Sequence, residues 1–321
     1  MIGTGDVTER KSGPAFSKVP GSRLVAVGNR TPSRAEDYAR RHGIPAWHAD
    51  PFDVITEPAV DIVYIATPPG SHPEYALACI KAGKPVYIEK PMARTGGECR
   101  EINSAAAEAG VKVFVAYYRR SLEYFNRVKG ILDSGRLGKP LQIDMAQYFP
   151  ARPEDVDPAN PPWRVMPEIS GGGYFHDMGC HALDILFYLF GNPLSVSGRA
   201  GNLGGLYQAD DTVAALLTLP GNVPAACSWS FIIPEPFAKD RVVVTGERGR
   251  LAFSIFSFEP IAFTPAGGEL ETFSTTQPEH IQFPCIRSIV DELRGRGSCP
   301  TTGLTAEVTS RVMDQVTEFS S

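Results

Sequence analysis

Short apolar runs alternate with longer amphipathic stretches from the start of the chain to about residue 118. The apolar runs, which are rich in β-branched residues and predict strands, are 24–27, 61–66, 85–89 and 111–116. The stretches between them that predict helices are 33–41, 73–82 and 97–109. A glycine follows each of these stretches, as is typical of a helix end. The alternation predicts a doubly wound α/β domain with a parallel sheet covered on both faces.

The pattern of apolar positions changes after residue 118. A predicted helix at 122–134 leads to a strand at 141–149, a proline-rich excursion at 150–162 and a helix in the segment after Gly171. Six strand-like runs separated by turn residues then follow, at 194–200, 211–219, 225–232, 241–245, 249–253 and 261–264. Consecutive strands with short turns predict an antiparallel sheet. Helices at 285–294 and 305–319 complete an α+β second domain, so we expect a division into residues 1–118 and 119–321.

The length and composition of the chain agree with two domains and exclude several classes of function. At 321 residues, the chain exceeds the usual size of a single domain. Its net charge of −5 is not offset by a basic run, so we expect no nucleic-acid partner. The six cysteines are scattered singly, which favours a reduced compartment. No apolar run approaches the roughly 20 residues of a membrane span and no signal peptide is visible, so we expect a cytoplasmic protein without membrane contact.

A glycine-rich segment opens the chain, with Gly3, Gly5 and Thr8 at the spacing of a dinucleotide-binding loop. Gly3 permits a tight turn, and Gly5 lets the backbone approach a diphosphate at a helix N-terminus. The residues that we expect to bind the cofactor here are Gly3, Thr4, Gly5, Asp6 and Val7.

A strand is expected before this loop, at the centre of the sheet. Only Met1 and Ile2 stand where about five or six residues belong. We therefore expect the strand to begin upstream, and a chain that restores it to be more stable.

The end of the second strand carries the signal for the type of dinucleotide. Where an NAD enzyme usually has an acid that binds the ribose hydroxyls, this chain has Asn29 and Arg30. A guanidinium pairs with a 2′-phosphate, so Arg30 favours NADP, with NAD as the alternative. The competing interpretation of Arg30 is a surface arginine at a strand end.

A charged pair follows the apolar run at 85–89. Glu89 and Lys90 stand at the carboxyl end of this predicted strand, which is the edge of an open α/β sheet where ligands bind. Pro91 ends the strand and fixes the direction of the chain, so we expect Lys90 to be held in place rather than solvated.

Taken in order, these motifs resemble those of the Gfo/Idh/MocA family, named after glucose–fructose oxidoreductase, inositol dehydrogenase and a rhizopine-catabolism protein. The matching motifs are the loop at 3–5, 66–69 with His72, 82–86, 89–93, 118–120, Trp163 with Arg164, and 171–184. The resemblance covers nearly the whole chain. It implies a Rossmann domain followed by an α+β domain with a large open-faced, mostly antiparallel sheet, which members use to form dimers or tetramers. It also implies reversible, nicotinamide-dependent oxidation of an alcohol, commonly on a sugar or cyclitol.

Lys90, Asp177 and His181 match the catalytic positions of that family. Asp177 and His181 are four residues apart, so on a regular helix they share one face, where the carboxylate can orient the imidazole. We expect His181 to remove the hydroxyl proton during alcohol oxidation, and the ammonium of Lys90 to stabilise the developing alkoxide. The glycines at 171–173 are expected to let the backbone enter this helix close to a ligand.

Further contacts are expected around these groups. The other residues expected at the cofactor are Thr67, Pro68, His72, Glu89, Lys90, Trp163 and Arg164, and those expected at the substrate are Lys90, Arg120, Arg164, Asp177 and His181. A zinc site of His181, Asp177 and His176 is the competing interpretation, but no distant Cys/His pair completes it, so we expect no metal. His176 and Asp184 have no assigned role.

Several functions remain open within this resemblance. The substrate could be a dihydrodiol or an anhydro-sugar instead of a polyol, or a tightly held NAD could serve glycoside cleavage. A cofactor-sensing regulator without catalysis is a different class, and it would be expected to lose the lysine or the histidine that this chain keeps. The polar residues of the 150–162 excursion favour a hydroxylated small molecule without naming it.

Overall fold

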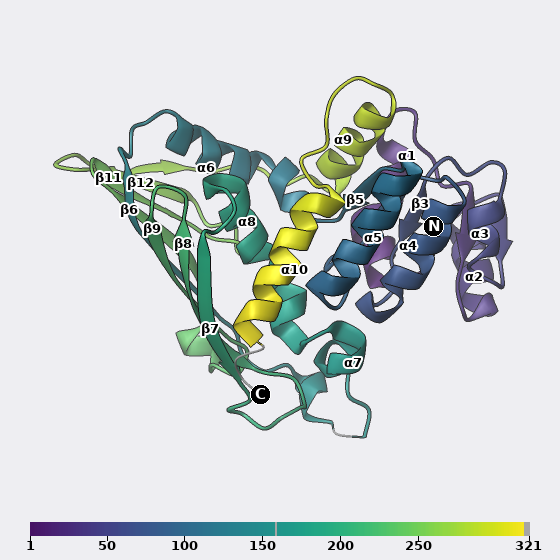
Figure 1. Ribbon diagram of the computed structural model, residues 1–321, viewed down its shortest axis with the longest axis horizontal. Helices are drawn as coiled ribbons and strands as arrows, with labels where there is room; N and C mark the ends of the chain where they lie inside the picture. The colour runs from purple at the N-terminus through teal and green to yellow at the C-terminus, as the bar shows by residue number, and fades with distance from the viewer. Residues whose placement is uncertain (158, 318–321) are drawn as a thin grey trace. The chain divides into compact units, whose positions relative to one another are not determined.

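The computed structural model describes residues 1–157 and 159–317 (Figure 1). The chain forms two compact units. The first consists of residues 1–122 and 278–310, and the second of residues 123–277 with the chain from Arg311 onward. The sequence predicted a single division after residue 118, whereas here a C-terminal segment returns to the first unit. The assignment of one part to the cofactor and the other to the substrate stays a prediction.

The sheet of the first unit is parallel, and its strands are β1 (Ala26–Gly28), β2 (Ala46–His48), β3 (Val63–Ile65), β4 (Val86–Ile88) and β5 (Val113–Val115). One ladder joins β1 to β2, and a second joins β3, β4 and β5 in that order. Ile2 forms parallel bridges to both Gly28 and Ile65, and so connects the two ladders. Its N–H donates to the carbonyl of Tyr64 at 2.8 Å. Met1 and Ile2 therefore occupy the central place in the sheet where a strand was expected.

The helices of the first unit are η1 (a π-helix, Thr8–Ser12), α1 (Gly13–Lys18), α2 (Pro32–His42), α3 (Asp53–Thr56), η2 (Pro69–Ser71), α4 (His72–Lys81), α5 (Gly96–Ala109), η3 (Tyr118–Ser121) and α9 (Phe283–Leu293). Helix α10 (Gly303–Thr317) begins in this unit and ends in the second; residues 318 and 319 of the helix predicted there lie outside the described residues. Gly43 and Gly110 end α2 and α5 in the left-handed conformation, as the sequence predicted.

Helix α9 explains why the C-terminal segment returns. It buries Cys285, Ile286 and Ile289 and packs against α1 and η3. An amphipathic helix needs an apolar surface to cover, but its sequence does not say which unit supplies that surface. The predicted division at residues 118/119 therefore could not include this return.

The second unit is built on one large sheet. Its strands are β6 (Pro140–Tyr148), β7 (Ser195–Gly201), β8 (Thr212–Leu219), β9 (Val223–Ser230), β10 (Lys239–Gly246), β11 (Gly249–Phe253), β12 (Ile261–Pro265) and β13 (Glu271–Phe273). Their order is β13-β12-β11-β10-β6-β9-β8-β7, and all neighbours are antiparallel except β6 and β9 (Figure 1). The predicted fold class, a parallel Rossmann-like sheet followed by a mostly antiparallel one, is confirmed.

The two faces of this large sheet differ in exposure. Along β8, Val213, Ala215 and Leu217 are buried, whereas the intervening Ala214 and Leu216 are exposed. The helices of the unit are α6 (Glu123–Asp133), η4 (Pro153–Val156), η5 (Trp163–Val165), α7 (Pro167–Ser170), η6 (a π-helix, Phe175–Gly179), α8 (Cys180–Phe190) and η7 (Glu235–Phe237). In the described part of the chain, no helix is long and apolar enough to cross a membrane.

Candidate active site

The glycine-rich loop has an open side. Gly3 adopts φ +97°, and a Cβ there would lie 2.6 Å from the carbonyl oxygen of Ala66, so only glycine fits at this turn. A Cβ on Gly5 would meet no atom within 4 Å. The N–H groups of Asp6 and Val7 open the first helical turn and have no carbonyl behind them in the helix. An open cradle with unpaired N–H groups at a helix start fits a diphosphate.

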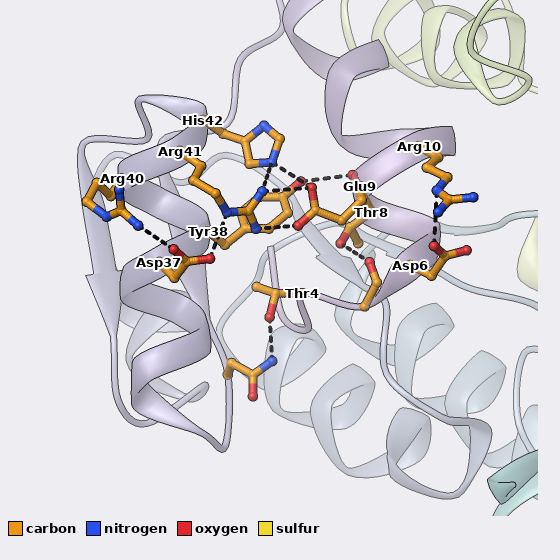
Figure 2. A network of polar contacts seen from close by, with 12 residues as sticks. Thr4, Asp6, Thr8, Glu9, Arg10, Asp37, Tyr38, Arg40, Arg41 and His42 are labelled. Carbon is orange, nitrogen blue, oxygen red and sulfur yellow. Dashed lines mark hydrogen bonds and ion pairs between the residues drawn. The ribbon is translucent and has the colours of Figure 1, made fainter.

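The segment at the end of β1, where the sequence predicts a cofactor contact, is hydrogen-bonded to this loop. The amide of Asn29 donates to the hydroxyl of Thr4 at 2.7 Å, and its oxygen accepts from the N–H of Thr31 at 2.8 Å. Figure 2 shows Thr4 with this bond in place. The Asn29 side chain therefore fixes the shape of the loop, and Arg30 beside it is exposed.

A polar network braces the same loop from its outer side (Figure 2). The hydroxyl of Tyr38 in α2 donates to the carbonyl of Thr8 at 2.9 Å, and burial raises the pKa of Tyr38 to about 12. Arg41 pairs with Asp37 and reaches across to Glu9 in η1. The hydrogen bond from Arg41 lowers the pKa of Glu9. The network connects η1, which follows the glycine-rich loop, to α2, which follows the segment after β1, so it holds these two segments together.

His72 connects the turn after β3 to the turn after β4. Its ring is completely buried, with Nε2 2.7 Å from the carbonyl oxygen of Thr67 and Nδ1 3.1 Å from that of Pro91. Burial lowers the pKa of His72, although these carbonyl contacts oppose the effect. Because both ring nitrogens lie within hydrogen-bond distance of backbone carbonyl oxygens, His72 connects these two turns, and its expected contact with the cofactor stays a prediction. Thr67 and Pro68 lie on one of the two turns that it holds.

Glu89 and Lys90 stand at the carboxyl end of β4, as predicted. The carboxylate of Glu89 is 6% exposed, and its Oε1 accepts from the hydroxyl of Tyr64 at 2.6 Å and from the amide of Gln282 at 2.7 Å. Its Oε2 accepts from the backbone N–H of Lys90 at 3.2 Å. The buried carboxylate thus positions the backbone from which the Lys90 side chain extends. Sequence reasoning missed Gln282, which lies 193 residues from Glu89 and carries no local motif.

The segment with the predicted catalytic Asp177 and His181 is not one regular helix. Asp177 lies in the π-helix η6, and His181 lies in the first turn of α8. Residues four apart lie on nearly the same face in a π turn as well as in an α turn, so the mutual reach of Asp177 and His181 stays a prediction. Short π segments inside α-helices occur often at functional sites. His181 is 4% exposed and its ring meets that of Phe256 edge to face.

Asp177 is hydrogen-bonded to Arg164, which in turn stacks on Trp163. Its Oδ2 accepts from Nε of Arg164 at 3.1 Å, and the Arg164 guanidinium lies 4.5 Å from the centre of the Trp163 ring. The Asp177 side chain is 14% exposed and that of Arg164 is 38% exposed. The structure therefore places Trp163, Arg164 and Asp177 in one partly open cluster.

His176, which had no assigned role, has a structural one. Its ring is 2% exposed, and Nδ1 donates to the carbonyl of Gly172 at 3.2 Å. Burial lowers its pKa to about 4, so the ring is neutral near neutral pH. A Cβ on Gly172 would lie 2.3 Å from Nδ1 of His176. The lack of a side chain at Gly172 therefore leaves room for the imidazole, and the expected close approach of residues 171–173 to a ligand stays a prediction.

The expected site residues divide between the two units. Those in the first are Gly3, Thr4, Gly5, Asp6, Val7, Asn29, Arg30, Thr67, Pro68, His72, Glu89, Lys90 and Arg120, and those in the second are Trp163, Arg164, Asp177 and His181. Arg120 is 7% exposed, and its guanidinium donates to the carbonyl of Pro300 at 3.2 Å, so part of it serves the packing of the first unit. The described residues contain no cluster of three or more His, Cys, Asp or Glu side chains placed to hold a metal ion.

Both halves of the chain match known families. Residues 1–117 match the oxidoreductase family with an NAD-binding Rossmann fold, and residues 125–252 match the GFO/IDH/MocA C-terminal domain. The chain is 34% identical to oxidoreductase P35 of Formosa agariphila, over 98% of this chain and 96% of that one. It is 28% identical to scyllo-inositol 2-dehydrogenase (NAD(+)) of Bacillus subtilis, over 96% of this chain and 87% of that one.

The fold is also similar to that of solved structures. Levoglucosan dehydrogenase in complex with NADH and levoglucosan aligns with a TM-score of 0.88 and 21% identity, covering 98% of this chain and 94% of that one. At this level of identity the likeness concerns the fold.

Proposed function

This chain belongs to the GFO/IDH/MocA family of NAD-binding oxidoreductases, and on that premise we propose that it transfers a hydride between a nicotinamide cofactor and the hydroxyl-bearing carbon of a sugar, cyclitol or related polyol. The observation that carries the proposal is the open cradle at Gly5, where the chain leaves room and unpaired N–H groups for a diphosphate. The likeness to a scyllo-inositol 2-dehydrogenase in sequence, and to a levoglucosan dehydrogenase in fold, supports the substrate class.

The cofactor would be held by residues 3–7, with the adenosine ribose near Asn29 and Arg30. When bound, the nicotinamide supplies the two-electron acceptor. The relatives' names mention NAD(+) and NADH, but this chain has an exposed arginine and an amide where an acid would bind the ribose hydroxyls. We therefore propose NADP as the preferred cofactor. Arg30→Ala is expected to raise KM for NADP⁺ about tenfold and to leave KM for NAD⁺ nearly unchanged; an equal effect on both would contradict the preference.

The catalytic roles are proposed for three residues of the family motifs. His181 accepts the hydroxyl proton, and the ammonium of Lys90 stabilises the negative charge that develops on the same oxygen. Asp177 orients the groups around it through its carboxylate, which already binds Arg164. Glu89, together with Tyr64 and Gln282, fixes the backbone position of Lys90.

Turnover of the cofactor tests these roles. A panel of polyols and sugars, with one dihydrodiol and one anhydro-sugar, is assayed with NADP⁺ and NAD⁺ by nicotinamide absorbance. Lys90→Met and His181→Ala are expected to lower kcat by at least about a thousandfold while the Kd of NADPH changes little. Lys81→Met, on the exposed face of α4, is the matched control. Undiminished turnover in either active-site variant would exclude the mechanism.

We also propose that the chain forms a homodimer or homotetramer through the exposed face of its large sheet. On this face Leu216 is 63% exposed, and a shallow hollow is lined by residues that include Ala214, Ser228 and Arg241. Leu216→Lys is expected to reduce the mass measured by light scattering to that of a monomer. Leu304→Lys, an exposed leucine of the first unit, is the control that is expected to keep the wild-type mass.

A further inference from the structure

Two buried thiols of the first unit lie together and have no part in the proposed function. Cys285 is in the first turn of α9, and Cys299 lies in the segment before α10. They are 0% and 5% exposed, and both are free. The hydroxyl of Thr301 lies between them, 3.6 Å from the sulfur of Cys285 and 3.3 Å from that of Cys299, and the hydroxyl of Ser288 donates to Cys299 at 3.3 Å. Two cysteines that appear unrelated in the sequence therefore form one pair.

The two sulfurs differ in chemical character. Hydrogen bonds from the Cys285 thiol, from Ser288 and from Thr301 hold the pKa of Cys299 below its usual range, although burial opposes them. The same contact and burial hold the pKa of Cys285 well above its usual range. A thiolate beside a protonated thiol is the arrangement of a reactive and a resolving cysteine. By contrast, burial raises the pKa of Cys79 and of Cys227 to about 12, which makes them inert.

A continuous polar path connects this pair to the backbone of Lys90. The hydroxyl of Tyr87 lies 3.8 Å from the sulfur of Cys285 and donates to the side-chain oxygen of Gln282 at 2.8 Å. Gln282, the residue that precedes α9, donates in turn to Glu89, which accepts from the N–H of Lys90. A displacement of the first turn of α9 therefore changes the hydrogen bonds of the Glu89 carboxylate.

We propose that Cys285 and Cys299 are a peroxide-oxidised pair that closes to a reversible disulfide and, by moving the first turn of α9, releases Gln282 from Glu89. Residues 293–298, directly before Cys299, are exposed, so a small peroxide reaches that sulfur by a local displacement of this segment. The effect on Lys90 rests on the proposed function, whereas formation of the disulfide does not.

The chemistry balances with hydrogen peroxide as the oxidant. The Cys299 thiolate attacks one peroxide oxygen, an S–O bond forms, the O–O bond breaks, and the departing hydroxide takes a proton to become water. The sulfur of Cys285 then attacks the sulfenic acid on Cys299, an S–S bond forms, and the hydroxyl leaves as water with the thiol proton. Two thiols are oxidised and one peroxide is reduced to two waters, and dithiothreitol reverses the reaction.

Mass spectrometry of the full chain tests the disulfide without reference to activity. After treatment with hydrogen peroxide and alkylation, the peptides with Cys285 and Cys299 are expected to be joined, and dithiothreitol is expected to separate them. Cys227→Ser is the control that keeps this link, whereas Cys285→Ser leaves Cys299 as the sulfenic acid, which dimedone labels. Oxidation that falls first on Cys79 or Cys227, or a Cys299 that never joins Cys285, would overturn the proposal.

Kinetics test the path to Lys90 separately. Peroxide is expected to lower kcat several-fold in the wild type and in Cys227→Ser, and to leave kcat of Cys285→Ser unchanged. Gln282→Leu is expected to have a low kcat before oxidation and no further loss after it. If the disulfide forms and kcat is unaffected, the path is refuted while the thiol pair stands. If no substrate turns over, the proposed function fails, and the mass measurement still decides the pair.

Discussion

Burial of His176 predicts a loss of stability of the second unit in mild acid. The folded protein holds the pKa of this ring at about 4, below the usual 6.5, because burial penalises the charged form. Between these values the unfolded chain binds more protons, so the contribution is fully present above pH 6.5 and is lost as the pH falls toward 4. The difference between 6.5 and about 4 corresponds to about 3 kcal/mol, of which about 2 kcal/mol is lost by about pH 5.

The variant His176→Asn isolates this contribution. Its amide can donate to the carbonyl of Gly172 as Nδ1 does, but it cannot titrate. From about pH 7.5 to about pH 5, the wild type is expected to lose about 2 kcal/mol more free energy of unfolding than this variant. Urea unfolding is followed by tryptophan fluorescence in a Trp47→Phe background, so that the signal comes from Trp163 and from Trp229, which is buried 5.0 Å from the Phe175 ring, both in this unit.

Phe175→Leu provides the matched control for that measurement. Phe175 is the completely buried neighbour of His176, so its truncation is expected to lower stability by about 1 kcal/mol at both pH values and to keep the pH dependence of the wild type. If His176→Asn shows the same loss toward acid as the wild type, then the imidazole is not the group that titrates, and the argument from burial fails.

Three further predictions concern the cofactor-binding segments. The new methyl group of Gly5→Ala meets no atom of the chain within 4 Å, so this variant is expected to unfold like the wild type while its Kd for NADPH, measured by calorimetry, rises at least about tenfold. Gly3→Ala places its methyl group 2.6 Å from a carbonyl oxygen at φ +97°, so it is expected to weaken NADPH binding and also to lower the free energy of unfolding by at least about 1 kcal/mol. Asn29→Asp still accepts from the N–H of Thr31, and the Thr4 hydroxyl, which accepts from the Asn29 amide, can donate to the new carboxylate instead; this variant is expected to shift the ratio of kcat/KM from NADP⁺ toward NAD⁺. Arg41→Met removes ion pairs of a side chain that is 41% exposed, so thermal melting is expected to show only a small fall in Tm.

The central strands of the first unit could be predicted because each is a buried apolar run bounded by turn residues. The observed β3 and β4, for example, lie inside the predicted runs at 61–66 and 85–89. Strands β2 and β13 were missed because each has three residues, none of them buried, so no apolar run marks them. These strands form because neighbouring strands offer hydrogen-bond partners, and a local pattern does not contain that information.

In the candidate site too, some features depend on the local sequence and others depend on residues far away in the chain. Motif spacing was sufficient to place the tight turn at Gly3 and the position of Lys90 after β4, since each depends on the few residues around it, while their roles stay predictions. The partners that hold Glu89 come from elsewhere in the chain, and Gln282 reaches it only because α9 returns to the first unit. This return also brings Cys285 against Tyr87. One tertiary event therefore provides both the support of the Lys90 backbone and the thiol pair that can disturb it, so a variant that detaches α9 should impair both together.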